Sequence, residues 1–149
     1  MSFPLLTTPE PVPKATREVP GRTSKRLVLV VEDHADTRDL LRFVVESLGH
    51  RAIEAADGEA AVRMVEGIMP DLILMDTSLP GVDGLRATER IRKLKNATKV
   101  TIIFLSGHAQ PHSREMALAA GGDDYFVKPI NLGELQLTLA KYLITSAAT

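Results

Sequence analysis

Short apolar runs, separated by longer amphipathic segments, repeat along the chain from residue 27 onward. Residues 27–31, 72–75 and 101–105 are continuous or nearly continuous apolar runs, as is typical of parallel strands that are buried on both faces. A shorter run at 124–127 predicts a further strand. Residues 51–55 are more polar, so we place this strand at an edge of the sheet.

The segments between these runs carry apolar residues at helical spacing. The first has an apolar stripe from Leu40 to Leu48, and Gly49 is placed to end it. Pro70 ends the second helix, Pro111 begins the fourth, and Asn131 caps the fifth. The predicted helices span about 36–48, 58–69, 85–95, 111–121 and 132 onward. Five strand–helix units with short connections predict an α/β fold, a doubly wound five-stranded parallel sheet with five helices.

Residues 1–26 differ from the rest of the chain. They contain five of the nine prolines and no repeating apolar pattern, which predicts a flexible, Pro-rich N-terminal tail. The end of this tail is mildly basic, and we prefer an inert extension over a docking segment. The folded domain is expected at 27–147. Because nothing resembling an output domain follows it, we expect a stand-alone domain.

The composition limits which binding partners and which cellular location we expect. The 149 residues carry 18 Lys and Arg against 19 Asp and Glu, so net charge recruits neither nucleic acid nor a membrane surface. Cysteine is absent, which excludes thiol chemistry and suits a cytoplasmic protein. No apolar run is long enough to cross a bilayer, and the N-terminus lacks the features of a signal peptide.

Candidate chemistry lies at the ends of the predicted strands. Glu32 and Asp33 follow the first strand, Asp76 the third, Ser106 the fourth and Lys128 the fifth. The carboxyl ends of parallel strands meet at one edge of a sheet, where ligands bind. Clustered carboxylates repel one another, and Mg²⁺ relieves that repulsion through oxygen ligands. An aspartate can also attack phosphorus, with a metal, a lysine and a hydroxyl stabilising the product.

At this point the chain resembles the receiver domains of two-component response regulators. The resemblance covers about 27–147. It rests on five motifs that lie at strand ends or in the loops after them: Val30-Val31-Glu32-Asp33, Leu74-Met75-Asp76, Leu79-Pro80-Gly81-Val82-Asp83-Gly84, Leu105-Ser106-Gly107 and Tyr125-Phe126-Val127-Lys128-Pro129. It implies a flavodoxin-like sheet with strand order 2-1-3-4-5.

The resemblance also implies roles for the acidic residues. Asp76 is expected to be the phosphoacceptor, taking its phosphoryl group from a phosphohistidine on a sensor histidine kinase or a histidine phosphotransfer protein. Asp33, Glu32 and Asp76, with the backbone carbonyl of Ser78, are expected to hold Mg²⁺. No other cofactor is expected. Catalysis is limited to the chain's own phosphorylation and slow autodephosphorylation, so we do not expect an independent enzyme.

The remaining matched residues are implied to stabilise and transmit the change. Lys128 would pair with phosphoryl oxygens, and Ser106 would move to bond one of them. Tyr125 matches an aromatic residue that turns inward when that hydroxyl moves. The Lys128–Pro129 bond is implied to be cis. Partner binding would then switch on the face around the fourth helix, fifth strand and fifth helix.

Several alternatives stay open. A receiver-like scaffold would bind partners without phosphate, and phosphorylation could also cause homodimerisation. Direct nucleic-acid binding through the third helix is less favoured, since its charges fit a solvated helix face; these are Arg86, Arg90, Arg92, Lys93 and Lys95. His108 is expected to be a partly exposed loop residue. His34, His50 and His112 are expected at the surface, without metal-ligand spacing among them.

Overall fold

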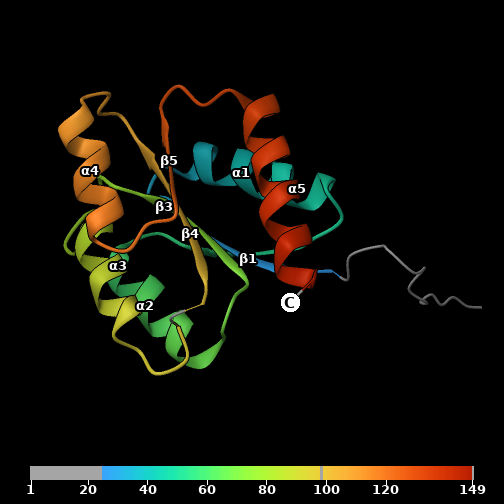
Figure 1. Ribbon diagram of the computed structural model, residues 1–149, viewed down its shortest axis with the longest axis horizontal. Coiled ribbons are helices and arrows are strands. Elements are labelled where there is room, and N and C mark those ends of the chain that lie inside the picture. The colour runs from blue at the N-terminus through green and yellow to red at the C-terminus, as the bar shows by residue number, and fades with distance from the viewer. Residues whose placement is uncertain (1–24, 98, 149) are drawn as a thin grey trace, which may run out of the picture.

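The computed structural model describes residues 25–97 and 99–148, which form one parallel sheet between two helical layers (Figure 1). The predicted tail, apart from Lys25 and Arg26, lies outside the described residues. All strand pairs are parallel, in the predicted order β2-β1-β3-β4-β5. The strands are β1 (Leu27–Val31), β2 (Arg51–Ala55), β3 (Leu72–Asp76), β4 (Thr101–Ser106) and β5 (Asp124–Val127).

The strand burial follows the apolar runs. β3 is buried at every position, and in β1 and β4 only the first residue is partly exposed, because helices cover both faces of these central strands. β2 is more exposed and lies at one edge of the sheet, as predicted. The prediction stopped β3 and β4 one residue early, since Asp76 and Ser106 are polar yet still pair within the sheet.

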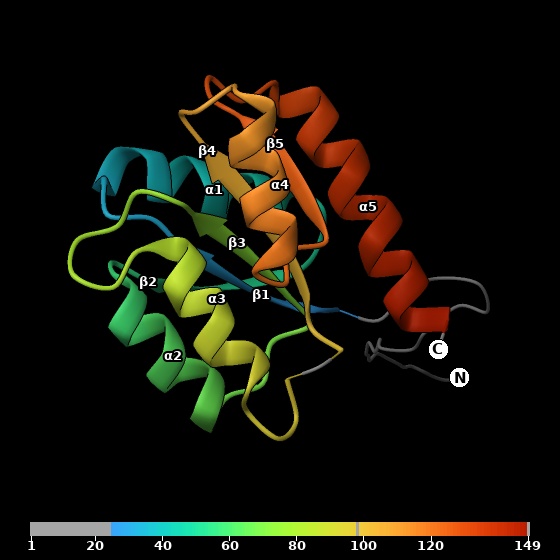
Figure 2. The same ribbon diagram turned by 60° about the vertical axis from the view of Figure 1, so that its left-hand side comes forward.

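Two apolar clusters hold the helices against the sheet. One cluster packs α1 and α5 on one face, through residues such as Val44 and Leu139. The other packs α2, α3 and α4 on the opposite face, through residues such as Val65, Ile91 and Ala117. Figure 2 shows α2, α3 and α4 together in front of the strands. The helices are α1 (Ala35–Ser47), α2 (Gly58–Gly67), α3 (Gly84–Arg92), α4 (Pro111–Ala119) and α5 (Leu132–Ala148).

Four helices differ from the prediction at one or both ends, and α1 is shifted by one residue, to Ala35–Ser47 rather than 36–48. α2 ends at Gly67 rather than residue 69, α3 spans Gly84–Arg92 rather than 85–95, and α4 ends at Ala119. The start of α3 is set by Asp83, whose side chain accepts the Arg86 N–H and caps the helix, an interaction typically worth about 1 kcal/mol. Local apolar spacing does not reveal where the last turn opens, so the predicted helices were too long at their C-termini.

One side chain of the predicted α1 stripe does not join the core. Leu40 is 44% exposed, whereas Leu41, Val44 and Val45 are buried. Including Leu40 in the stripe was therefore wrong, because α1 is rotated so that its neighbour Leu41 faces the sheet. Gly49 follows the helix with a φ of 87°, the left-handed conformation expected at a helix C-terminus.

Two residues predicted at the surface form structural contacts instead. His50 is buried, and its Nδ1 accepts the backbone N–H of Arg26 at 2.9 Å, so the strand entrance would lose a bond without it. Arg92 donates to the carbonyls of Val100 and Gly121, each at 2.7 Å, and to Asp123 at 3.0 Å. Arg92 therefore connects the end of α3 to the entrances of β4 and β5 and does not belong to a solvated face.

Within the part of the chain that the structure describes, no helix combines the length and apolar character needed to span a membrane.

Candidate functional site

The carboxyl ends of β1, β3, β4 and β5 lie at one edge of the sheet (Figure 1), where the predicted side chains follow them. Glu32 follows β1, Asp76 ends β3, Ser106 ends β4 and Lys128 follows β5. The register places these ends level with one another, since Val31 pairs with Met75 and Asp76 with Leu105. Because β1 and β3 are neighbours although β2 lies between them in sequence, the site lies at the topological switch point of the sheet.

Lys128 lies between two buried carboxylates. Its Nζ is 3.1 Å from Glu32 Oε1 and 3.4 Å from Asp76 Oδ2. The Glu32 side chain is fully buried and that of Asp76 is 3% exposed, whereas Lys128 is 29% exposed. The ammonium therefore neutralises part of the negative charge that the sheet concentrates at this edge.

This arrangement of charges raises the pKa values of Asp76 and Lys128 and lowers that of Glu32. Burial raises the pKa of Asp76 above its usual value, and the nearby charge of Glu32 adds to that rise. Burial acts the same way on Glu32, but hydrogen bonds from the His34 N–H and from Lys128 outweigh it and lower the Glu32 pKa. Burial opposes the charge on Lys128, yet the Glu32 hydrogen bond and the Asp76 charge raise the Lys128 pKa overall. Of these two carboxylates, Asp76 is the one less stabilised in its charged form.

The loop after β3 approaches the second oxygen of Asp76. The backbone N–H of Ser78 donates to Asp76 Oδ1 at 3.1 Å. The N–H of Gly84, at the start of α3, donates to the Thr77 carbonyl at 3.2 Å. These bonds hold the loop close to the carboxylate. The predicted role of the Ser78 carbonyl as a metal ligand stays a prediction.

A histidine joins the acidic pair after β1. His34 Nδ1 lies 3.2 Å from Glu32 Oε2 and 3.4 Å from Asp33 Oδ1. One ligand atom from each of these residues lies within 4.8 Å of the others, which is close enough for a shared metal ion. His34 was expected only as a surface residue. Its position directly after the acidic pair was the sequence signal that could have identified it.

The oxygen-rich part of this donor set fits a magnesium ion. Mg²⁺ prefers carboxylate and carbonyl oxygens and usually takes few protein ligands. Glu32 is fully buried and Asp33 is 31% exposed, so the pair reaches from the interior toward solvent. Asp76, whose charge burial disfavours, would gain from a nearby cation.

Ser106, His108 and Tyr125 form a second group beside the carboxylates. The His108 N–H donates to Ser106 Oγ at 3.0 Å, and the Tyr125 hydroxyl donates to the His108 carbonyl. Ser106 and Tyr125 are buried, and His108 is exposed as expected. A cavity of about 140 Å³ adjoins them, and its lining includes Thr77 and Met116. The cavity leaves room for these side chains to rearrange.

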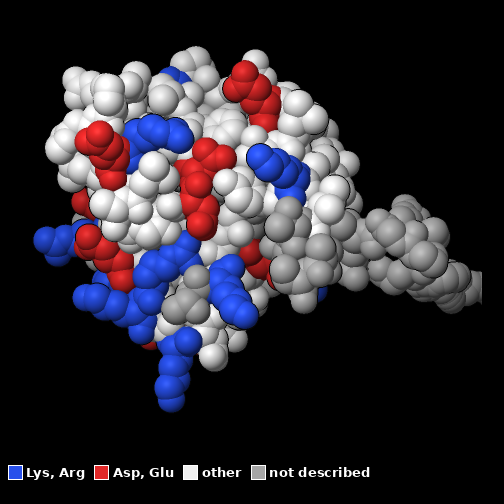
Figure 3. All heavy atoms as spheres, in the orientation of Figure 1, with Lys and Arg blue, Asp and Glu red and all other residues white. Residues whose placement is uncertain are grey.

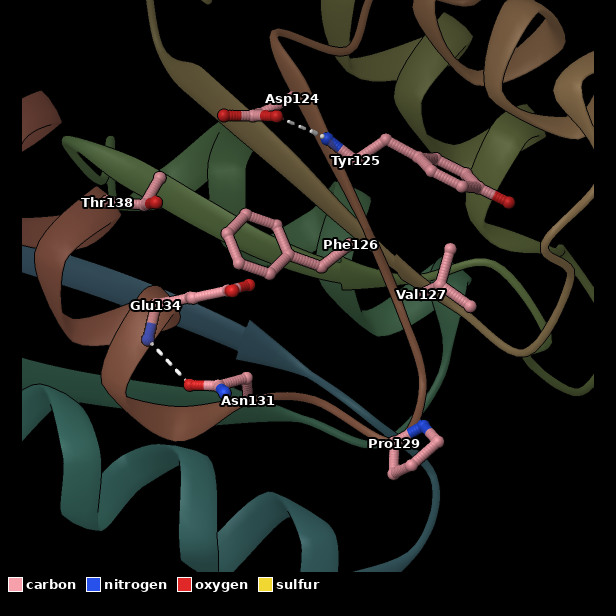
Figure 4. A pocket seen from close by; sticks show the side chains of 8 residues that line it. All are labelled: Asp124, Tyr125, Phe126, Val127, Pro129, Asn131, Glu134 and Thr138. Atoms are coloured by element: carbon pink, nitrogen blue, oxygen red, sulfur yellow. Dashed lines mark hydrogen bonds between the residues drawn. The ribbon is translucent and has the colours of Figure 1, made fainter.

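A groove runs along the outer edge of β5 against α5 (Figure 4). Side chains alternate along β5, so Phe126 points toward Glu134 and Thr138 of α5, whereas Tyr125 points to the other side of the strand. The groove has a volume of about 430 Å³. The peptide bond between Lys128 and Pro129, which follows β5, is cis, as the resemblance implied.

The fold and the site together define the class of protein. The family model described as "Response regulator receiver domain" matches residues 28–140, and the chain belongs to that family. The sequence-based identification and the strand order are therefore both confirmed.

Particular relatives agree with this assignment. The receiver domain of the sensor histidine kinase PA1611 from Pseudomonas aeruginosa, solved with a magnesium ion in its active site cleft, is 39% identical; the match covers 80% of this chain and 98% of that one, with a TM-score of 0.74. Two Escherichia coli transcriptional regulators also match. KdpE is 38% identical over 82% of this chain and 53% of its own length, and PhoB is 34% identical over 74% and 48%. The chain thus spans about half the length of these two regulators.

Proposed function

We propose that this chain accepts a phosphoryl group on Asp76 from a phosphohistidine of a sensor histidine kinase or a histidine phosphotransfer protein. The observation that supports this most directly is the Lys128 ammonium between the buried carboxylates of Glu32 and Asp76. In the reaction an Asp76 oxygen bonds to phosphorus while the phosphorus–nitrogen bond of the phosphohistidine breaks. The electron pair of the broken bond goes to the partner's imidazole, which is the leaving group and takes up a proton from solvent to leave as the neutral ring.

The residues around Asp76 have complementary roles in this proposal. Lys128 moves its charge toward the phosphoryl oxygens, where it stabilises the transferred group. Glu32, Asp33, Asp76 and the Ser78 carbonyl would hold Mg²⁺, and the bound ion would supply charge neutralisation. The magnesium ion in the PA1611 receiver domain supports this choice of metal. The chain's own catalysis stays limited to its phosphorylation and slow autodephosphorylation.

The output of the switch is a change in partner binding. Ser106 moves to donate a hydrogen bond to the phosphoryl group, so the His108 N–H loses its acceptor. Tyr125, bonded to the His108 carbonyl, responds to that change. Tyr125 and the groove of Figure 4 belong to the same strand, so the effect reaches the face formed by α4, β5 and α5. A downstream protein, or a second copy of the chain, would bind there.

The charge distribution gives less support to direct nucleic-acid binding. Lys and Arg side chains gather at the lower left of Figure 3, whereas the upper part of that face carries both acidic and basic side chains. Of the five basic residues considered in and after α3, Arg90 pairs with Glu59 at 2.9 Å and Arg92 is bonded to backbone carbonyls. Both positive charges are thus partly compensated within the protein.

Intact-mass measurement after incubation with a small phosphodonor and Mg²⁺ tests the proposal. The wild type should gain one phosphoryl group, and Asp76→Ala should gain none. Asp36→Ala is a matched control, because Asp36 is an exposed acid in the first turn of α1. Beryllofluoride with Mg²⁺ should likewise bind the wild type and the control but not Asp76→Ala.

Two outcomes would count against the proposal. Phosphoryl uptake by Asp76→Ala at the wild-type level would move the acceptor to another residue. A wild type that takes up no phosphoryl group from any donor, while still capturing partners, would identify the chain as a phosphate-independent scaffold.

A further inference from the structure

His34 adds a nitrogen donor to the acidic pair, and the proposed magnesium site does not use it. Its Nδ1 faces two carboxylate oxygens, at 3.2 Å from Glu32 and 3.4 Å from Asp33. In the tautomer with a proton on Nδ1, this nitrogen donates a hydrogen bond to Glu32 Oε2; in the other tautomer its lone pair is available to a cation held by the same oxygens. A metal ion would satisfy all three groups.

The backbone holds His34 in this position. His34 precedes α1 as its N-cap residue, but its side chain makes no capping hydrogen bond, so the imidazole is available for other contacts. Its backbone N–H donates to Glu32 Oε2 at 3.2 Å. Arg38 Nη1 donates to the Glu32 carbonyl at 2.8 Å, and the Arg38 N–H donates to the His34 carbonyl at 2.9 Å. The three candidate ligands therefore lie on a loop that is fixed at both ends.

The exposure of the three side chains decreases from His34 through Asp33 to Glu32. The His34 side chain is 76% exposed, that of Asp33 is 31% exposed and that of Glu32 is fully buried. A cation can meet the imidazole first and then the two carboxylates. The second Glu32 oxygen, Oε1, stays with Lys128, so metal binding at Oε2 does not require that ion pair to break.

The donor types select the class of metal. Mg²⁺ prefers oxygen ligands, whereas imidazole nitrogen suits zinc, nickel, copper and iron. We propose that Glu32, Asp33 and His34 form a binding site for a first-row transition-metal dication such as Zn²⁺, which is held more tightly than Mg²⁺. This inference rests on the proposed function, because it takes the same acidic pair to be the metal-binding part of the site. Zn²⁺ would compete with Mg²⁺ for Glu32 and Asp33.

Calorimetric titration of the full chain with Zn²⁺ and, separately, with Mg²⁺ tests the site. His34→Ala should weaken Zn²⁺ binding by at least about 10-fold, the lower end of the loss caused by removing groups that support a metal. Its Mg²⁺ affinity should stay close to that of the wild type. His112→Ala is the matched control, since His112 is an exposed histidine on α4, and it should bind both metals as the wild type does.

Ring resonances of the four histidines give an independent measurement. Zn²⁺ should shift the His34 signals at substoichiometric concentration and leave those of His112 in place. Equal Zn²⁺ affinity in His34→Ala and the wild type would overturn the inference. A parallel loss of Mg²⁺ and Zn²⁺ affinity in His34→Ala would also overturn it, because His34 would then not discriminate between the metals.

The variant Asp33→Asn shows whether the transition-metal inference or the proposed magnesium site has failed. If Asp33→Asn loses Mg²⁺ binding while His34→Ala keeps full Zn²⁺ affinity, the magnesium site stands and the transition-metal site is wrong. If Asp33→Asn binds Mg²⁺ as the wild type does, the metal assignment of the proposed function is wrong.

Discussion

Lys128 is the residue on which the charge balance of the site most directly depends. Replacing it with methionine keeps the aliphatic length but leaves Glu32 and Asp76 buried near one another without a cation. We expect Lys128→Met to lower the free energy of unfolding by about 2–4 kcal/mol, somewhat below the cost of breaking a wholly buried pair because Lys128 is 29% exposed. Urea denaturation measures this change.

Adding Mg²⁺ tests whether the lost stability of Lys128→Met comes from the missing positive charge. A divalent cation would replace part of the missing charge, so Mg²⁺ should stabilise Lys128→Met more than it stabilises the wild type. Lys93→Met, at an exposed position beyond α3, is the control and should change stability little. Equal stability of Lys128→Met and the wild type without Mg²⁺ would show that the ammonium does not balance these carboxylates.

The lowered pKa of the buried His50 leads us to predict that the stability of the protein depends on pH. Burial, and then the charge of Arg26, lower the pKa of His50 in the folded protein below its ordinary value of 6.5. The unfolded chain therefore binds more protons than the folded one between the lowered pKa and 6.5, so stability rises with pH across that window. The contribution is complete above pH 6.5 and is lost as the pH falls through the folded-state pKa.

Denaturation at a series of pH values checks this sign. The difference in unfolding free energy between the wild type and His50→Gln should shrink as the pH falls from 6.5 through the lowered folded-state pKa of His50. His112→Gln, at an exposed position, should leave the pH profile unchanged. A constant difference between the wild type and His50→Gln at all pH values would contradict the role of His50 as a neutral acceptor for the Arg26 N–H.

At the scale of the elements, the packing of α3 against β3 determines where Asp76 lies. A Cβ added to Gly84 would collide with the backbone carbonyl oxygen of Asp76. Gly84→Ala should therefore displace the end of β3, with a stability loss of about 1–3 kcal/mol and slower phosphoryl uptake by Asp76. Gly67→Ala is the control, since a Cβ there meets nothing within 4 Å. Unchanged phosphorylation and stability in Gly84→Ala would show that this close approach is not needed.

The apolar pattern along the sequence was enough to predict the strands and helices but not the polar contacts between distant residues. β1, β3 and β4 were predictable because continuous apolar runs have few alternatives to a strand buried on both faces. The contacts at the end of α3 were not, because one of the carbonyl acceptors of Arg92 is Gly121, 29 residues away. Spacing along the sequence cannot show which distant carbonyl a guanidinium will reach.

In the candidate site, too, some contacts could be predicted from the sequence and others could not. Side-chain types at strand ends predicted that Glu32, Asp76 and Lys128 would meet, because a parallel sheet brings its carboxyl ends together. His34 was missed, because its contact depends on the path of the loop after β1 and the direction in which the ring turns. The topology of the sheet therefore predicted the ion-pair cluster of Glu32, Asp76 and Lys128, whereas the loop geometry after β1 determines where His34 lies.

At the scale of the whole molecule, the proposed switch connects the carboxylates to the outer edge of the sheet through Ser106, His108 and Tyr125. Ser106→Ala removes the acceptor of the His108 N–H and the hydroxyl that would reach the phosphoryl group. We expect this variant to bind beryllofluoride with Mg²⁺ through Asp76, while the accompanying change in amide hydrogen exchange across α4 and β5 is largely lost. Exchange measured by mass spectrometry with and without beryllofluoride tests the connection.

Ser47→Ala, on the exposed surface of α1, is the matched control and should keep the full change. The comparison separates binding from transmission, because Lys128 and the acidic residues that retain the analogue are intact in both variants. If Ser106→Ala responded in α4 and β5 as the wild type does, Tyr125 would have to sense phosphorylation by another route. Since Tyr125 is buried beside the cavity that Thr77 and Met116 line, that route would run through the packing of α4 and not through the hydroxyl of Ser106.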